Sequence, residues 1–197
     1  MQREILFATN NAHKLEEVKA ILGDGYKLVT LRERGITEEI PEEQPTIEGN
    51  ALQKVRYVHA RSGADCFADD TGLEVAALGG APGVYSARYS GEGDDGNNQK
   101  LLRELADVPE KQRTGRYVCA ISCIFPDQTE LTAAGTCEGR IGYELSGDHG
   151  FGYDPLFYVG NRSFGQYKDE EKDAISHRGK ALRLFCEKLK EYQVKNA

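Results

Sequence analysis

The sequence lacks a long apolar run, a Cys-x-x-Cys pair, an internal repeat and an excess of basic residues. No apolar run approaches the roughly 20 residues that a membrane-spanning helix needs. Residues 1–4 lead into only five apolar or small residues, which is too few for a signal peptide. The 5 cysteines form no Cys-x-x-Cys pair and most have apolar neighbours, as buried thiols do. We therefore expect a reducing, cytoplasmic compartment.

The charge balance limits the partners of the chain. Lys and Arg number 25 against 32 Asp and Glu, which gives a formal net charge of −7. Broad nucleic-acid binding needs a basic surface, so nucleic acid is not an expected partner. The lack of a long apolar run makes a membrane an unexpected partner as well. A local basic pocket for a small anion remains compatible with this charge. With 39% hydrophobic and 29% charged residues among 197, the chain is long and apolar enough to fold around a core.

Apolar patterning predicts alternating strands and helices. Strands are expected at residues 5–8, 27–30, 66–68, 117–125, 130–136 and 156–159. Helical spacing of apolar residues is found near residues 15–22, 47–62, 98–105 and 178–192. Residues 33–46, 79–98 and 147–155 are expected to be loops. The pattern indicates an α/β or α+β protein with a mixed sheet. We expect a single domain over residues 1–197, in which any second lobe would cover roughly 110–160.

A polar turn follows the first predicted strand. It consists of Thr9, Asn10, Asn11, Ala12, His13 and Lys14. Free backbone N–H groups at a helix start, with a lysine one turn later, suit a phosphate. The alternative is an asparagine cap with a solvated lysine. The turn lacks the glycine framework of a P-loop.

Two adjacent carboxylates, Asp69 and Asp70, close the apolar run at 66–68. Such a pair is costly to hold together unless a cation neutralises it, and carboxylate oxygens with water suit Mg²⁺. Glu42 or Glu43 could supply a third carboxylate. The alternative is a turn in which an aspartate caps the following backbone. A second acidic pair, Asp94 and Asp95, lies in a Gly- and Asn-rich stretch and is interpreted as solvated.

A glycine-flanked aromatic residue stands in the loop that contains Phe151, Gly152, Tyr153 and Asp154. Glycines let the ring of Phe151 reach out of a loop, where a planar base could stack on it. Asp154 could accept hydrogen bonds from ring N–H groups. The alternative is a turn with a phenylalanine in the core.

Cationic side chains lead into the helix expected from residue 178. Lys172 is followed by Ser176, His177 and Arg178, and Ser176 fits an N-cap. Donors at a helix start oppose the favoured dipole pattern, which hints at an anionic or carbonyl-bearing ligand. The alternative for a lone histidine is a structural role.

Five stretches stand in order at matching spacing: TNNAHK at 9–14, ADDTGL at 68–73, GGAPGVYSARY at 79–89, FGYDP at 151–155 and ISHRG at 175–179. Together they resemble the inosine/xanthosine triphosphate pyrophosphatase family, over about residues 3–190. The stretch at 79–89 and the His177–Arg178 pair are the most specific. Gln166 stands where the family often has an acidic residue, and the segment 42–48 aligns ambiguously.

The resemblance implies a role for each matched residue. Residues 9–14 match a triphosphate-binding loop, in which Asn11 and Lys14 are the polar contacts, and Lys54 matches a further phosphate contact. Asp70 matches a general base and metal ligand, Asp69 its acidic companion, and Thr71 a substrate contact. The segment from Phe151 to Asp154 matches a base-stacking loop. Lys172, His177 and Arg178 match the pocket for the 6-oxo edge of the purine.

The resemblance also implies an activity and a fold. The activity is Mg²⁺-dependent hydrolysis of ITP, dITP and XTP to the nucleoside monophosphate and pyrophosphate. The fold is an elongated mixed sheet with flanking helices and two lobes around a nucleotide cleft, commonly in a homodimer. Two other functions stay open: a nucleotide-binding module without hydrolysis, and a hydrolase for another modified nucleotide.

Overall fold

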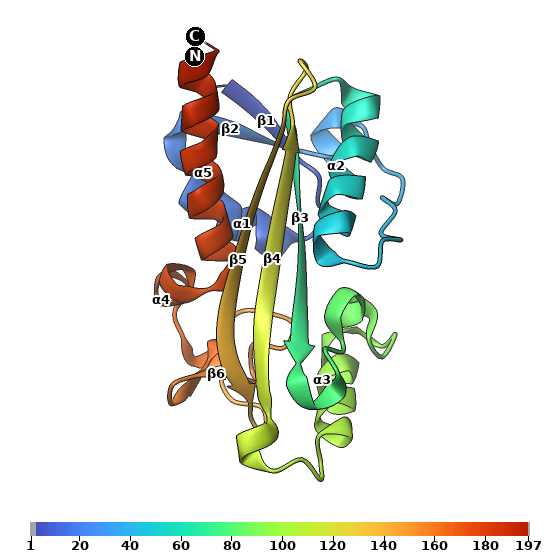
Figure 1. The fold of residues 1–197 in the computed structure, drawn as a ribbon, viewed down its shortest axis with the longest axis vertical. Coiled ribbons are helices and arrows are strands. Elements are labelled where there is room, and N and C mark those ends of the chain that lie inside the picture. Colours follow the sequence, from blue (N-terminus) through green and yellow to red (C-terminus); the bar gives the residue numbers. More distant parts are fainter. Residues whose placement is uncertain (1–2, 197) are drawn as a thin grey trace. The chain divides into compact units, whose positions relative to one another are not determined.

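The computed structural model describes residues 3–196 and contains a seven-stranded mixed sheet with flanking helices (Figure 1). The strands are β1 (Arg3–Phe7), β2 (Tyr26–Thr30), β3 (Cys66–Val75), β4 (Thr114–Ile124), β5 (Glu130–Ile141), β6 (Phe157–Val159) and β7 (Arg162–Ser163). The α-helices are α1 (Ala12–Leu22), α2 (Ile47–Ser62), α3 (Gly93–Glu104), α4 (Asp169–Ile175) and α5 (His177–Lys195). The strand order is β2-β1-β3-β4-β5-β6-β7. Because β1 pairs in parallel with β2 and β3 while β5 and β6 pair antiparallel, the predicted mixed α/β sheet is confirmed.

The chain divides into two compact units. Unit 1 contains the described chain up to Asp70, Cys119–Gly135 and the chain from Arg178 onward. Unit 2 contains Thr71–Val118 and Thr136–His177, whereas the second lobe expected from the sequence covers roughly 110–160. The chain passes from one unit to the other within β3, β4 and β5, and again between His177 and Arg178.

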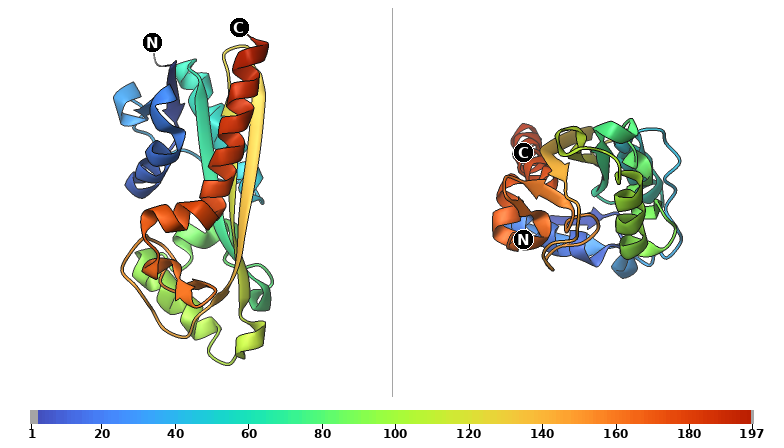
Figure 2. Two further views of the ribbon diagram at one scale, coloured as in Figure 1. Left: turned by 90° about the vertical axis from the view of Figure 1, so that its left-hand side faces the viewer. Right: turned by 90° about the horizontal axis from the view of Figure 1, so that it is seen from below.

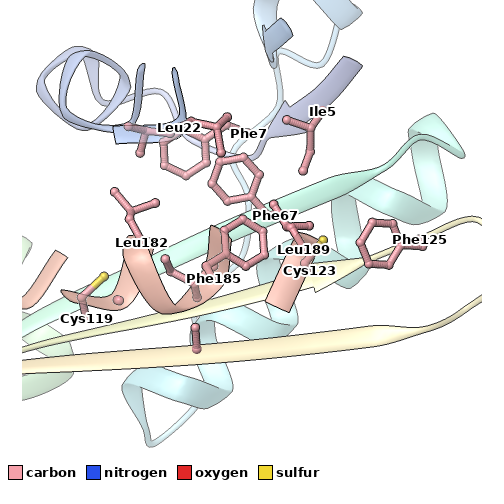
Figure 3. Close-up of a cluster of buried hydrophobic side chains, with 14 residues drawn as sticks. Ile5, Phe7, Leu22, Phe67, Cys119, Cys123, Phe125, Leu182, Phe185 and Leu189 are labelled. Carbon is pink, nitrogen blue, oxygen red and sulfur yellow. The ribbon is translucent and has the colours of Figure 1, made fainter. Parts of the chain in front are cut away.

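Alternating side chains of β1 build two cores in unit 1. Ile5 and Phe7 pack with apolar residues of α1 and α5, and the Phe7 ring stacks on Phe67 at 4.5 Å (Figure 3). Leu6 and Ala8 face the other way and pack with residues of α2. Helix α5, the red helix in Figure 2, runs alongside the part of β5 that carries Ala133. Strand β1 is thus covered on both faces.

Aromatic rings dominate the core of unit 2. The ring of Tyr117 meets Phe157 edge-on at 4.6 Å and lies parallel to Phe164 at 6.0 Å. Leu73 and Leu101 belong to the same buried cluster. Tyr153, which is 4% exposed, belongs to this cluster too.

Two predicted boundaries are wrong. The stretch 79–98 is not one loop, because a 3₁₀ helix spans Gly83–Arg88 and α3 begins at Gly93. Asp94 and Asp95 lie in the first turn of α3, where negative charge interacts favourably with the helix dipole. The strand predicted at 66–68 continues through the two aspartates to Val75. Its acidic residues remain in the strand because cations from other elements pair with them.

The cysteines are unbridged thiols. Cys66, Cys119, Cys123 and Cys137 are buried, as predicted, and Cys186 is partly buried. Burial raises the pKa of the Cys66 and Cys123 thiols, which keeps them protonated. Among residues 3–196, no helix is both long enough and apolar enough to cross a membrane.

Candidate active site

The polar turn after β1 caps helix α1. The side-chain oxygen of Asn11 accepts a hydrogen bond from the backbone N–H of Lys14 at 3.2 Å. The hydroxyl of Thr9 accepts one from the N–H of Asn11, also at 3.2 Å. Asn10, Ala12 and His13 are exposed. The capping interpretation of Asn11 is therefore confirmed, but Lys14 is not simply solvated, because its side chain is only 14% exposed.

Lys14 reaches Asp69 on β3. Its Nζ lies 3.1 Å from Asp69 Oδ1, and Arg178 Nε lies 3.3 Å from Asp69 Oδ2. Asp69 is 2% exposed. Burial alone would raise the pKa of Asp69, but the charges of Lys14 and Arg178 hold it well below its ordinary value. Asp69 is thus a permanent anion that joins α1 to α5.

The guanidinium of Arg178 lies between two carboxylates. Besides Asp69, it makes a short ion pair with Glu17 of α1. Glu17 was not among the residues predicted from the sequence, although its position three residues after Lys14 places both side chains on one helix face. A role for Arg178 in reading the purine stays a prediction, because both recorded ion pairs of its guanidinium are with carboxylates.

Replacing Asp69 by Asn leaves Lys14 and Arg178 without their shared anion. We expect the free energy of unfolding at pH 7 to fall by about 3–5 kcal/mol. A carboxylate with a lowered folded pKa stabilises the protein above its unfolded pKa of about 3.9, and this contribution is lost as pH falls through the folded pKa. The difference in unfolding free energy between the wild-type and Asp69→Asn proteins, measured with urea, should therefore begin to shrink below about pH 4 and continue to shrink as pH falls further. A difference that stays constant with pH would contradict this assignment.

Asp70 pairs with a different set of residues. Its Oδ1 lies 3.3 Å from Lys54 Nζ, and the same ammonium lies 2.7 Å from Glu42 Oε1. Among the residues that the structure describes, the buried Oδ2 of Asp70 has no hydrogen-bond partner. Burial raises the pKa of Asp70 and the charge of Glu42 adds to this, although Lys54 opposes it. Asp70 is therefore a more basic carboxylate than an ordinary aspartate.

Strand geometry explains why neighbouring aspartates have separate partners. Successive side chains of a strand point to opposite faces, so Asp69 shares a face with Phe67 and Asp70 shares one with Ala68. Phe67 packs in the cluster with α1 and α5, whereas Ala68 packs in the cluster with α2. The face of each aspartate therefore matches the helix that supplies its cation.

The acidic segment before α2 brings Glu42, not Glu43, to this group. Glu43 is exposed, and its carboxylate accepts a hydrogen bond from Gln53 Nε2 at 3.3 Å. Within residues 3–196, no three His, Cys, Asp or Glu side chains form a ready metal site. Mg²⁺ commonly binds through one or two carboxylates, water and substrate phosphates. Glu42 and Asp70, whose Oδ2 has no partner among residues 3–196, fit that requirement. Metal ligation by Asp70, Asp69, Glu42 or Glu43 stays a prediction.

A second residue group, in unit 2, centres on Asp154. Its Oδ2 accepts hydrogen bonds from the backbone N–H of Phe151 at 3.0 Å and from Lys172 Nζ at 2.8 Å. Its Oδ1 accepts one from the Tyr117 hydroxyl at 3.4 Å. The ammonium of Lys172 also lies 5.1 Å from the centre of the Phe151 ring. Asp154 and Lys172 are each 3% exposed, so Asp154 organises the loop that presents Phe151.

Tyr117 links this loop to His177. The two rings stack at 4.4 Å and 11°, and His177 is 3% exposed. Burial and the nearby charge of Asp154 raise the pKa of Tyr117 well above its ordinary value, so its hydroxyl remains a donor. Sequence reasoning took Tyr117 only as a strand residue. The available signal was a hydroxyl-bearing ring in a mostly apolar strand.

The remaining residues singled out in the sequence have contacts or positions of their own. Tyr153 donates its hydroxyl to the Ser86 carbonyl at 2.7 Å. Asp94 and Asp95 are exposed, as predicted, but Asp94 Oδ2 also accepts a hydrogen bond from the N–H of Gly152 at 2.8 Å. Thr71 directly follows Asp70 in β3. Gln166 accepts a hydrogen bond from the backbone of Ser163 at 2.9 Å, which gives this departure from the family pattern a local structural role.

Three comparisons place the chain among known proteins. Residues 5–188 match the profile of the Ham1 family. The dITP/XTP pyrophosphatase of Clostridium tetani is 43% identical over 96% of this chain and 98% of its own length. That of Exiguobacterium sibiricum is 47% identical over 91% of this chain and 93% of its own length. The Ham1 protein of Staphylococcus aureus has a similar structure, with a TM-score of 0.87 and 36% identity over 96% of this chain and 100% of that one.

These matches cover the stretches on which the sequence-based resemblance depends, so that resemblance is confirmed. The parallel β1–β3 pairing, the pair Asp69–Asp70 and the His177–Arg178 junction all lie within the matched residues. The chain belongs to the Ham1 family.

Proposed function

We propose that this protein is a Mg²⁺-dependent pyrophosphohydrolase that converts ITP, dITP and XTP to the nucleoside monophosphate and pyrophosphate. The names of its relatives support this substrate class. The observation that carries the proposal is Asp70, a buried carboxylate that lies beside Glu42 and Lys54 and has one oxygen without a hydrogen-bond partner among the described residues. A module that only binds nucleotides would not need this arrangement.

The charges of the first group explain a need for a divalent cation. The group contains four carboxylates and three cations, and thus a net charge of −1: Glu17, Glu42, Asp69 and Asp70, with Lys14, Lys54 and Arg178. A triphosphate brings roughly four more negative charges, which this group would repel. When bound by Glu42 and Asp70, Mg²⁺ would screen the phosphate oxygens and favour ionisation of water. Lys14 and Lys54 then contact the phosphate chain.

Asp70 serves as the general base. Its Oδ2 is buried and has no hydrogen-bond partner among the described residues, so it is available to accept a proton from water. A water molecule held by Asp70 attacks the α-phosphorus and gives its proton to the carboxylate. The bond between the α-phosphorus and the bridging oxygen breaks, and pyrophosphate leaves with the electron pair. No covalent enzyme intermediate is required.

The second group selects the base. Phe151 stacks on the purine, and donors from His177 and Lys172 face its 6-oxo group. Adenine presents an amino group there, so donors would face donors. An unsatisfied buried donor costs about 1–3 kcal/mol, which favours the deaminated purine. Tyr117 and Asp154 hold these donors in place.

A product-resolved assay tests the proposal. With Mg²⁺, ITP and XTP should give equal amounts of monophosphate and pyrophosphate, ATP should be turned over at least about tenfold more slowly, and EDTA should abolish the activity. Release of orthophosphate, or equal rates with ATP, would contradict it. Tight binding of ITP without turnover would favour the non-hydrolytic module, and preference for another modified base would favour the third function. The predicted homodimer and cytoplasmic location stay predictions.

A further inference from the structure

Helix α3 makes two hydrogen bonds to one peptide segment of the Phe151 loop. Asp94 Oδ2 accepts a hydrogen bond from the N–H of Gly152 at 2.8 Å. Asn98 Nδ2 donates one to the carbonyl of the same Gly152 at 2.9 Å. Asp94 and Asn98 are four residues apart, so their side chains lie on one face of α3. The helix thus holds both backbone polar groups of Gly152.

These contacts complete a set that fixes the backbone around Phe151. The N–H of Phe151 donates to Asp154 Oδ2 at 3.0 Å, and the Phe151 carbonyl accepts from the N–H of Asp154 at 3.2 Å. Gly152 has a φ of +61°, which side-chain-bearing residues rarely adopt. Every backbone polar group of Phe151 and Gly152 is therefore engaged, two by the loop itself and two by α3.

The two contacts from α3 differ in character. Asn98 is 3% exposed, whereas Asp94 is exposed. Among residues 3–196, Asn98 Oδ1 has no hydrogen-bond partner, so the bond to Gly152 determines which way this amide points. The neighbouring Asn97 bonds instead to the carbonyls of Ser86 and Ala87 and does not reach the loop.

We infer that Asp94 and Asn98 are positioning residues that hold Phe151 where its ring stacks on the purine. The inference rests on the proposed function, since it assigns these residues to the base side of the substrate. Without the contacts from α3 the loop must be ordered when the nucleotide binds, and that ordering opposes binding of the base. The phosphate side of the substrate is untouched by this loss.

Variants of Asp94 and Asn98 can remove or keep each of the two hydrogen bonds to Gly152. Asp94→Ala removes the acceptor for Gly152 and should raise the Kd of IMP about tenfold. Asp94→Asn keeps an acceptor oxygen and should stay within about twofold of wild type. Asn98→Asp places a carboxylate against the Gly152 carbonyl and should weaken IMP binding more than Asn98→Ala does. The control is Asp95→Ala, because Asp95 is an exposed carboxylate of the same turn with no recorded bond to the loop.

Two ligands separate positioning from general damage to the fold. Calorimetry should show weakened binding of IMP by Asp94→Ala, with unchanged binding of inorganic tripolyphosphate, which has no base. With ITP as substrate, KM should rise while kcat stays within about twofold. The inference would be overturned if wild type and Asp94→Ala bound IMP equally well, or if Asp94→Ala bound IMP and tripolyphosphate more weakly to the same extent. It would also be overturned if the wild-type protein did not bind IMP. Product analysis of the wild-type enzyme separately decides the proposed function.

Discussion

Replacing Asp70 by Asn should lower kcat for ITP hydrolysis by about 10³-fold, because the amide cannot accept the proton of the attacking water. Asn at this position keeps the shape of the side chain and still offers an oxygen to Lys54. The measurement is single-turnover hydrolysis at saturating ITP and Mg²⁺, with Asp107→Asn as a control at an exposed aspartate. A loss of less than about tenfold would remove Asp70 from the role of general base.

The same substitution should leave stability unchanged or increase it. A carboxylate whose folded pKa is raised destabilises the folded protein at neutral pH, and this penalty disappears as pH falls below the unfolded pKa of about 3.9. Asp70→Asn removes the penalty, so its Tm at pH 7 should equal or exceed that of wild type. Asp69→Asn should behave in the opposite way, since the pKa of Asp69 is lowered. A fall in Tm for both variants would show that Asp70 is a structural anion as well.

Replacing Gly150 by Ala should raise KM for ITP by about 100-fold, because it breaks the buried pair of Asp154 and Lys172. A Cβ on Gly150 would overlap Oδ2 of Asp154, the oxygen that accepts hydrogen bonds from Lys172 and from the backbone of Phe151. Asp154 is 3% exposed and has little room to move. Initial-rate kinetics with ITP give the effect on KM, and thermal unfolding gives the effect on stability.

Gly160→Ala is the matched control for backbone strain. Gly160 has a φ of +64°, similar to the +75° of Gly150, but a Cβ there would have nothing within 4 Å. Both variants carry the strain of about 1–2 kcal/mol that a left-handed alanine imposes. Only Gly150→Ala also displaces Asp154. Equal KM values for the two variants would show that Asp154 does not organise the Phe151 loop.

The sequence identifies the candidate acidic residues of the site more readily than the cations that form ion pairs with them. Asp69 and Asp70 are evident as neighbours in the chain, but their cations come from Lys14, Lys54 and Arg178, which are distant in sequence. Periodicity assigns side chains to faces of a strand without specifying what covers each face. Once α1 and α5 cover one face and α2 the other, the separate partners follow.

Residues that act through others were the hardest to predict. In the sequence, Asp94 stands in what resembles an acidic loop and Tyr117 in an apolar strand. Glu17 stands on what resembles a solvated helix face. Their contacts depend on tertiary packing, because Gly152, His177 and Arg178 lie far along the chain. Asn11 was predictable, since helix capping is local and needs only the residues of the first turn.

The discontinuous make-up of unit 1 has a consequence during protein synthesis. Its first strand emerges from the ribosome early, but α5 supplies Leu182 and Phe185 to the same core and is translated some 170 residues later. Until then the ring of Phe67 lacks its contact with Phe185 and Asp69 lacks Arg178, although α1 already packs in this cluster. The core of unit 1 can therefore be completed only after nearly the whole chain has been synthesised.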